Sequence, residues 1–274
     1  MKFFSNYSTR KTLALFLLLL IAVLFHYPRT FFIADQSWQV TGKESLLENY
    51  PILCKWDCGF YHYLANRSDL TKNPQFSAFF PLFPITLDLL HNLMPKIELS
   101  ALSVIASNFF SVISIALITL LGSHLHSGSA RNNFGWNRFG LLLAFAVAVY
   151  PNSQFSSYGY PEALFLLLYA GGIFSLAMNN WRGAAIFCGL AAVTRPQGIW
   201  ILGVLLILAF RYFLLNQSNG KLRLKSVKEI DITFFHVLLI CLTPFFLFLI
   251  WQWQSFGNPL SFLKVQSTHL EQVI

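Results

Sequence analysis

Three charged side chains beside apolar runs are the residues best suited to chemistry. Asp57 follows Trp56 and precedes two tyrosines, at Tyr61 and Tyr63. Glu162 opens one uncharged run, and Arg195 separates two others. A carboxylate can take a proton from an acceptor hydroxyl, and an arginine between apolar runs is costly unless it meets a carboxylate or a phosphate. These residue types predict a polar site at the edge of a membrane.

Each acid also has an ordinary structural explanation. Asp57 lies close to Lys55, so it could form a surface ion pair or cap a helix, and residue type alone favours that role. Glu162 after Pro161 suits the first turn of a helix without any catalytic task. A catalytic role for either carboxylate therefore needs support from the rest of the sequence.

The composition predicts the elements that hold these residues. Of 274 residues, 55% are hydrophobic and 11% are charged, whereas a soluble domain carries about a quarter of its residues as charges. Uncharged runs suited to crossing about 30 Å of hydrocarbon recur along the chain. We expect a single all-α, polytopic membrane domain over residues 1–274, whose first run is a signal anchor. Its seven spans are expected at about 12–33, 100–122, 139–157, 162–180, 183–194, 198–215 and 232–252.

The distribution of Lys and Arg predicts the orientation. With the amino terminus inside, 11 of the 19 basic residues but only two of the 11 acids fall on the inner side. This asymmetry follows the positive-inside rule and explains the net charge of +8 without a nucleic-acid partner. The outer side then holds a large loop at residues 34–99, which contains Asp57, and the turns that carry Glu162 and Arg195.

Two stretches do not fit a simple span. Residues 183–215 form either one long kinked helix or two short elements that turn near Arg195. The pair is preferred because a single helix would move the basic cluster at 221–228 to the outer side. Residues 73–87 contain three prolines, so they are expected to form a loop or interfacial element that shapes a cavity.

Several nucleotide and metal signatures do not occur in the sequence. It has no Walker loop, no Gly-x-Gly-x-x-Gly and no Asp-x-Asp. Cys54 and Cys58 could form a short disulfide, but further metal ligands at useful spacing are lacking. The sequence predicts no cofactor, with a divalent metal as an open alternative, and it suits a sugar donor carried on a polyprenyl phosphate.

A series of short blocks follows at the expected outer positions. They are Trp56-Asp57 with Tyr61 and Ala65; Ala78-Phe79-Phe80-Pro81-Leu82-Phe83-Pro84; Tyr160-Pro161-Glu162; Thr194-Arg195 with Gly198; and Phe256-Gly257-Asn258-Pro259-Leu260-Ser261-Phe262 with Gln266. In type and order they resemble the glycosylphosphatidylinositol second-mannosyltransferase (GPI mannosyltransferase 2) family and its bacterial relatives. The resemblance spans most of the chain, and its first two blocks are the most specific.

The resemblance implies a membrane glycosyltransferase of the multispan C-type (GT-C) class. Such an enzyme would transfer mannose or a related sugar from a dolichyl- or polyprenyl-phosphate donor to a lipid-linked or cell-envelope acceptor. Asp57 becomes the expected catalytic base, on the outer face of a bacterial inner membrane or the luminal face of the endoplasmic reticulum. Substrate binding is assigned by the same resemblance to Trp56, Tyr61, Glu162, Arg195 and Gln266.

Other functions are kept as alternatives. The segment Asn66-Arg67-Ser68-Asp69 stands where the family has a Gly-Tyr pair, and the chain stops at Ile274 where relatives continue, so an inactive or truncated copy is one alternative. A flippase or transporter of lipid-linked sugars is another, and a non-catalytic scaffold is a third. The polar residues gather on one side and not at the midplane, which favours the transferase over transport. The sequence does not identify a protein partner.

Overall fold

The computed structural model describes most of the chain carboxyl-terminal to residue 56. The described residues are 57–66, 74–126, 138–150, 155–156, 158–218, 221–224 and 231–265. Trp56, Gln266 and the expected first span at 12–33 lie outside them.

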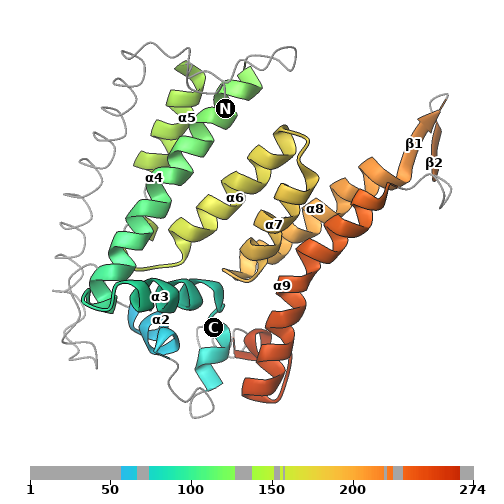
Figure 1. Ribbon diagram of the computed structural model, residues 1–274. Helices are drawn as coiled ribbons and strands as arrows, with labels where there is room; N and C mark the ends of the chain where they lie inside the picture. The colour runs from blue at the N-terminus through green and yellow to red at the C-terminus, as the bar shows by residue number, and fades with distance from the viewer. Residues whose placement is uncertain are drawn as a thin grey trace, which may run out of the picture. The chain divides into compact units, whose positions relative to one another are not determined.

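The described residues form helices and one short hairpin (Figure 1). In chain order the elements are α2 (Cys58–Ala65), the 3₁₀ helix η2 (Pro74–Ala78), α3 (Leu82–Leu93), α4 (Leu99–His126), α5 (Arg138–Val149), α6 (Glu162–Ala177), α7 (Trp181–Ala192), α8 (Pro196–Leu214), β1 (Leu215–Ser218), β2 (Lys221–Leu224) and α9 (Ile232–Phe256). The strands pair antiparallel, with Leu215 opposite Leu224. Apart from this hairpin, the all-α prediction holds for the described part of the chain.

Three of these helices, α4, α8 and α9, are long and apolar enough to cross a membrane. Helices α5, α6 and α7 are apolar but shorter. The 12 residues of α5 or α7 extend about 18 Å at 1.5 Å per residue, less than the hydrocarbon thickness. The apolar helices agree with a multi-pass membrane protein, and the number of seven spans stays a prediction.

The contacts divide the chain into two compact units, and each is described by itself. The first unit includes residues 57–59 and Ser100–Ala163, and the second includes Phe60–Leu99 and the chain from Leu164 onward. Helix α4 therefore belongs almost wholly to the first unit, whereas α3, α7, α8 and α9 belong to the second.

Helices α7, α8 and α9 lie side by side in the second unit (Figure 1). The shared core consists of small residues on α7 that meet larger ones on α8 and α9: Ala184, Ala185, Cys188 and Ala192 face Leu202, Leu205, Phe234 and Val237. A Cβ at Gly189 would come within 2.8 Å of the carbonyl oxygen of Cys241. Small side chains therefore allow the backbones of α7 and α9 to approach closely, as at many membrane helix interfaces.

The break between α7 and α8 agrees with the sequence prediction. Helix α7 ends at Ala192 and α8 begins at Pro196, so two helices form and not a single kinked one. Proline at the first helical position needs no N–H donor, and its ring favours the start of a new helix. Arg195 thereby lies in the turn, directly before α8.

Candidate active site

Asp57 lies in the first unit, beside the turn that leads to Glu162. It is exposed and occupies the residue before α2. The next residue, Cys58, is fully buried and disulfide-bonded, and its Sγ lies 3.8 Å from Ser103 Oγ on α4. Cys54 lies outside the described residues. The exposed carboxylate of Asp57 is thus attached to a firmly packed neighbour.

The turn at residues 158–162 packs against the same part of α4. Ser107 Oγ donates to the carbonyl of Tyr160 at 3.1 Å. A Cβ at Gly159 would lie 2.7 Å from Cys58 Sγ and would also collide with Ser103. The structure therefore brings two of the family-like blocks, around Asp57 and around Tyr160-Pro161-Glu162, to neighbouring positions on α4.

Glu162 is the first residue of α6 and is half-buried. Its position after Pro161 confirms the predicted helix start, where a carboxylate interacts favourably with the helix dipole. In the same turn, burial raises the pKa of the fully buried Tyr158.

Tyr61, expected to bind substrate, is buried among aromatic residues of the second unit. Its ring makes edge contacts with Phe79 at 5.2 Å and with Phe83 at 5.5 Å between centroids. Tyr63 stacks on Phe76 at 4.6 Å. Helix α2 is thus fastened to the Ala78–Pro84 block by ring packing, and a contact of Tyr61 with substrate stays a prediction.

The other family-like blocks of the second unit meet around Phe80. Its ring stacks on Phe248 of α9 at 4.7 Å and contacts the edge of Phe262 at 5.5 Å. The backbone N–H of Leu82 donates to the carbonyl of Val193 at 3.1 Å, which joins α3 to the turn between α7 and α8. Segments that are far apart in the sequence therefore pack against one another in the second unit.

Arg195 lies in that turn, two residues after Val193, and is half-buried. The carbonyl of Arg195 accepts a hydrogen bond from Gly198 N at 2.9 Å, and Thr194 Oγ1 donates to Leu190 at 2.9 Å. The turn is therefore held on both sides of Arg195.

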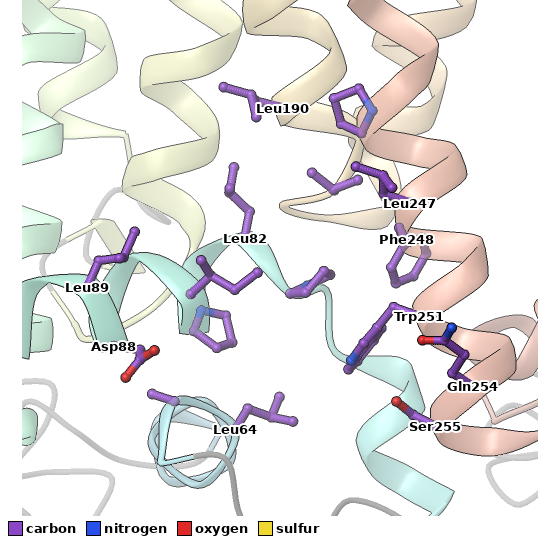
Figure 2. A pocket seen from close by; sticks show the side chains of 16 residues that line it. Leu64, Leu82, Asp88, Leu89, Leu190, Leu247, Phe248, Trp251, Gln254 and Ser255 are labelled. Atoms are coloured by element: carbon purple, nitrogen blue, oxygen red, sulfur yellow. The ribbon is translucent and has the colours of Figure 1, made fainter.

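A cavity of about 1010 Å³ lies in the second unit between α2, α3, the end of α7 and α9 (Figure 2). Most of its lining is apolar, including Leu82, Leu190, Val193, Leu247 and Phe248. Pro81 and Pro84 also line it. The expectation that the proline-containing stretch shapes a cavity is confirmed.

The polar residues that line this cavity were not predicted from the sequence. Asp88 of α3 contributes a carboxylate, and Trp251, Gln254 and Ser255 contribute polar groups from the last turns of α9. Asn92 Nδ2 donates to Asp88 Oδ1 at 3.2 Å. The available signal was helical spacing, because Pro81, Pro84 and Asp88 recur on one face of a helix.

His62 of α2 is a buried titratable group outside the expected spans. It is 1% exposed, and burial lowers its pKa to about 4, while the charge of Glu98 raises it slightly. His62 is therefore neutral at physiological pH and acts as a packed residue of α2.

Within the described part of the chain, no group of three or more His, Cys, Asp or Glu is placed to hold a metal ion.

Comparison with known proteins gives a family for this arrangement. The model of the mannosyltransferase (PIG-V) family matches residues 8–263. The chain belongs to the mannosyltransferase (PIG-V) family. The match includes every expected site residue of the PIG-V family chain except Gln266 and confirms the resemblance inferred from the short blocks.

One curated relative is the GPI alpha-1,6-mannosyltransferase 2 of Mus musculus. It is 28% identical over 159 residues, which cover 56% of this PIG-V family chain and 31% of the mouse protein. The matched region thus spans about a third of the length of that relative. No solved structure matches the chain.

Proposed function

We propose that the protein is a membrane mannosyltransferase that uses a polyprenyl- or dolichyl-phosphate sugar and a lipid-linked or cell-envelope acceptor. The Asp57 carboxylate takes the proton of the acceptor hydroxyl as its oxygen forms a bond to the anomeric carbon. The bond from that carbon to the phosphate oxygen breaks, and the lipid phosphate leaves with the electron pair. Configuration at the anomeric carbon is inverted.

The family match over residues 8–263 is the observation that carries this proposal. The exposure of Asp57 supports its role as base, since a base must reach a substrate hydroxyl. The packing of Cys58 against α4 holds that turn in place, and the adjacent Tyr160 turn carries Glu162 as a supporting residue.

Arg195 is proposed to bind the donor phosphate. A guanidinium offers paired N–H donors that match phosphate oxygens, and the departing phosphate gains negative charge in the transition state. The expected setting is an integral membrane protein with this site on the outer or luminal face. No metal step is included in the proposal.

The test separates two roles of Asp57, because this residue precedes α2 and could simply cap it. Asn is as good a helix cap as Asp but cannot act as a base. Asp57→Asn should lower transfer of mannose from polyprenyl-phosphate mannose by about 10²–10⁴-fold, with an unchanged unfolding temperature. Asp57→Ala should lose transfer to the same extent and also lose stability.

Transfer by purified protein in lipid nanodiscs is the measurement, with radiolabelled donor. Full transfer by Asp57→Asn would reject Asp57 as the base. Movement of the labelled lipid between leaflets without any covalent product would favour the flippase alternative over the transferase.

A further inference from the structure

We propose that Arg182 and His236 bind the phosphate of an anionic phospholipid. The two residues lie at one end of the second unit, where α7 and α9 begin and α8 ends. The Arg195 turn lies at the other end of α8, whose 19 residues extend about 28 Å at 1.5 Å per residue. The proposed lipid site therefore belongs to the predicted inner side of the membrane and does not depend on the proposed transferase function.

A hydrogen bond between α7 and α9 holds the guanidinium of Arg182. Its Nη2 lies 3.2 Å from Nδ1 of His236. Arginine has no acceptor, so the guanidinium donates and Nδ1 accepts, which leaves the proton of the neutral imidazole on Nε2. The guanidinium has five N–H donors, and this bond uses one of them. Because Arg182 is exposed, its other donors can meet a phosphate in the paired geometry that arginine favours.

The positive charge at this end exceeds the negative charge. Among the residues that the structure describes, no carboxylate forms an ion pair with Arg182 or with Arg211 in the last turn of α8. Asp231 caps α9 by accepting a hydrogen bond from Thr233 N at 2.8 Å. The sequence between α8 and α9 adds four basic residues against one further acid, Glu229: Lys221, Arg223, Lys225 and Lys228. Such an excess of basic residues attracts a lipid of net negative charge.

Aromatic rings place this end of the unit at the level of lipid headgroups. The ring of Trp181 packs on Tyr212 at 4.7 Å and on Phe213 at 5.2 Å between centroids. Tyr212 is 55% exposed, and Trp and Tyr are enriched at the membrane–water interface. Arg182 follows Trp181 directly, so its guanidinium is expected at the depth of the phosphates.

Exposed apolar side chains continue from the Arg182–His236 pair along both helices. Ile186 lies one turn after Arg182 on α7, and Leu239 lies three residues after His236 on α9, so each shares a face with the polar residue. Ile186 is 48% exposed and Leu239 is 68% exposed. In a membrane protein, exposed apolar side chains of this size belong next to lipid. A phospholipid thus fits with both its phosphate and its acyl chain, whereas a soluble phosphate would use the polar pair alone.

Native mass spectrometry of the full chain in detergent tests the occupant. The protein is titrated with phosphatidylglycerol or with phosphatidylcholine carrying the same acyl chains. We expect phosphatidylglycerol to bind about fivefold more tightly, because of its net charge. Arg182→Gln should weaken phosphatidylglycerol binding about 10–100-fold, as for loss of a charge-assisted hydrogen bond, with an unchanged unfolding temperature in the absence of lipid. Equal affinity for both lipids in the unchanged protein would overturn the proposal.

Arg211→Gln is the matched control for the site. It removes the same charge at the same end of the unit without touching the bond between Arg182 and His236. Its effect on phosphatidylglycerol binding should stay below about fivefold, the contribution of one basic residue near a charged lipid surface. Equal weakening by Arg182→Gln and Arg211→Gln would show a diffuse basic surface and overturn a defined site.

Two further measurements test the pair and its ligand. His236→Phe keeps a ring but removes the acceptor that holds Arg182, so phosphatidylglycerol affinity should fall about threefold or more; unchanged affinity would contradict the role of the pair. Inorganic phosphate or a polyprenyl phosphate is then added as a competitor. We expect neither to displace phosphatidylglycerol at equal concentration, and displacement by either would assign the site to that phosphate and overturn the phospholipid. The assay contains no sugar donor, so its outcome is independent of transfer activity.

Discussion

Gln252 of α9 donates a hydrogen bond from Nε2 to the main-chain carbonyl of Ser77, over 2.9 Å and 175 residues of sequence. Both residues are almost fully buried. The bond fastens α9 to the segment that precedes α3. The bond therefore joins two segments of the second unit, which also contains the cavity.

Gln252→Glu should destabilise the protein. The substitution removes the N–H donor to Ser77 and places a carboxylate opposite the buried carbonyl oxygen, at a cost of about 1–3 kcal/mol or more. Thermal unfolding in detergent measures the loss.

Gln254→Glu is the matched control for that variant. Gln254 lies on the same helix and is exposed, so the change should alter stability by less than about 0.5 kcal/mol. Equal destabilisation by both substitutions would show that the bond to Ser77 is not the cause.

Gly159→Ala should disturb the Asp57 turn. The added Cβ would lie 2.7 Å from Cys58 Sγ, so the neighbours must move, at a cost of about 1–3 kcal/mol. Because Cys58 follows Asp57 directly, transfer should fall about tenfold or more through misplacement of the carboxylate. Differential scanning fluorimetry and the transfer assay measure the two effects.

Gly203→Ala provides the comparison. Gly203 lies inside α8 with nothing within 4 Å of an added Cβ, so the change should be neutral or stabilise by up to about 1 kcal/mol. If Gly159→Ala proves equally harmless in stability and transfer, the packing of the two turns does not position Asp57.

His62 should make the protein less stable in acid. Its pKa is about 4 in the folded protein because of burial, against 6.5 in the unfolded chain, so the unfolded state binds the proton first as the pH falls. Stability is complete above pH 6.5 and falls between pH 6.5 and 4, by about 3 kcal/mol in total at 1.36 kcal/mol per pKa unit. Denaturant unfolding at a series of pH values measures the slope.

Two variants identify His62 as the source of this slope. His62→Gln should flatten it, whatever its effect on stability at neutral pH. Glu98→Gln should lower the pKa of His62 further, because the Glu98 charge raises it. A slope that is unchanged in His62→Gln assigns the acid sensitivity to other groups.

Local chemistry made several elements predictable from the sequence. Pro161 and Glu162 are favourable at a helix start, and α6 begins at Glu162. Pro196 predicted the break between α7 and α8, because it suits a first helical turn and no interior. These signals depend on residues that are neighbours in the sequence. The helix boundaries that they set can therefore be predicted from the sequence.

The prolines of the 73–87 stretch show why other elements could not be predicted. Three prolines predict that no spanning helix forms there, which is consistent with a 12-residue α3, but Pro81 and Pro84 lie at the cap and in the first turn of that helix. The first N–H groups of a helix need no intrahelical acceptor, so proline is tolerated there. The helix continues to Leu93 and carries Asp88 to the cavity.

The cavity itself depends on distant contacts. Asp88 lines the cavity because two contacts hold the start of α3 against the rest of the second unit. Leu82 bonds to the carbonyl of Val193, and Phe80 stacks on Phe248. No short spacing in the sequence encodes these tertiary contacts. Asp57 and Glu162 stand in motifs and can therefore be singled out from the sequence, whereas Asp88 stands in no motif and cannot.

Arg195 provides the sharpest test of donor binding. Replacement by Gln removes the charge that is proposed to meet the donor phosphate, so the donor KM should rise roughly 10–100-fold, as expected for loss of a charge-assisted hydrogen bond. Arg195→Lys keeps the charge but not the paired N–H geometry. Its donor KM should therefore lie between that of the unchanged protein and that of Arg195→Gln. Initial rates at varied donor and fixed acceptor measure the effect.

Arg211→Gln makes the same change of charge in the last turn of α8, the helix that follows Arg195. Arg211 is exposed and belongs to no family-like block, so donor and acceptor KM should both stay unchanged. A rise in acceptor KM alone in Arg195→Gln would move this arginine from the donor to the acceptor. Equal effects of the two glutamine variants would show that net charge near the membrane, and not a phosphate contact, governs the rate.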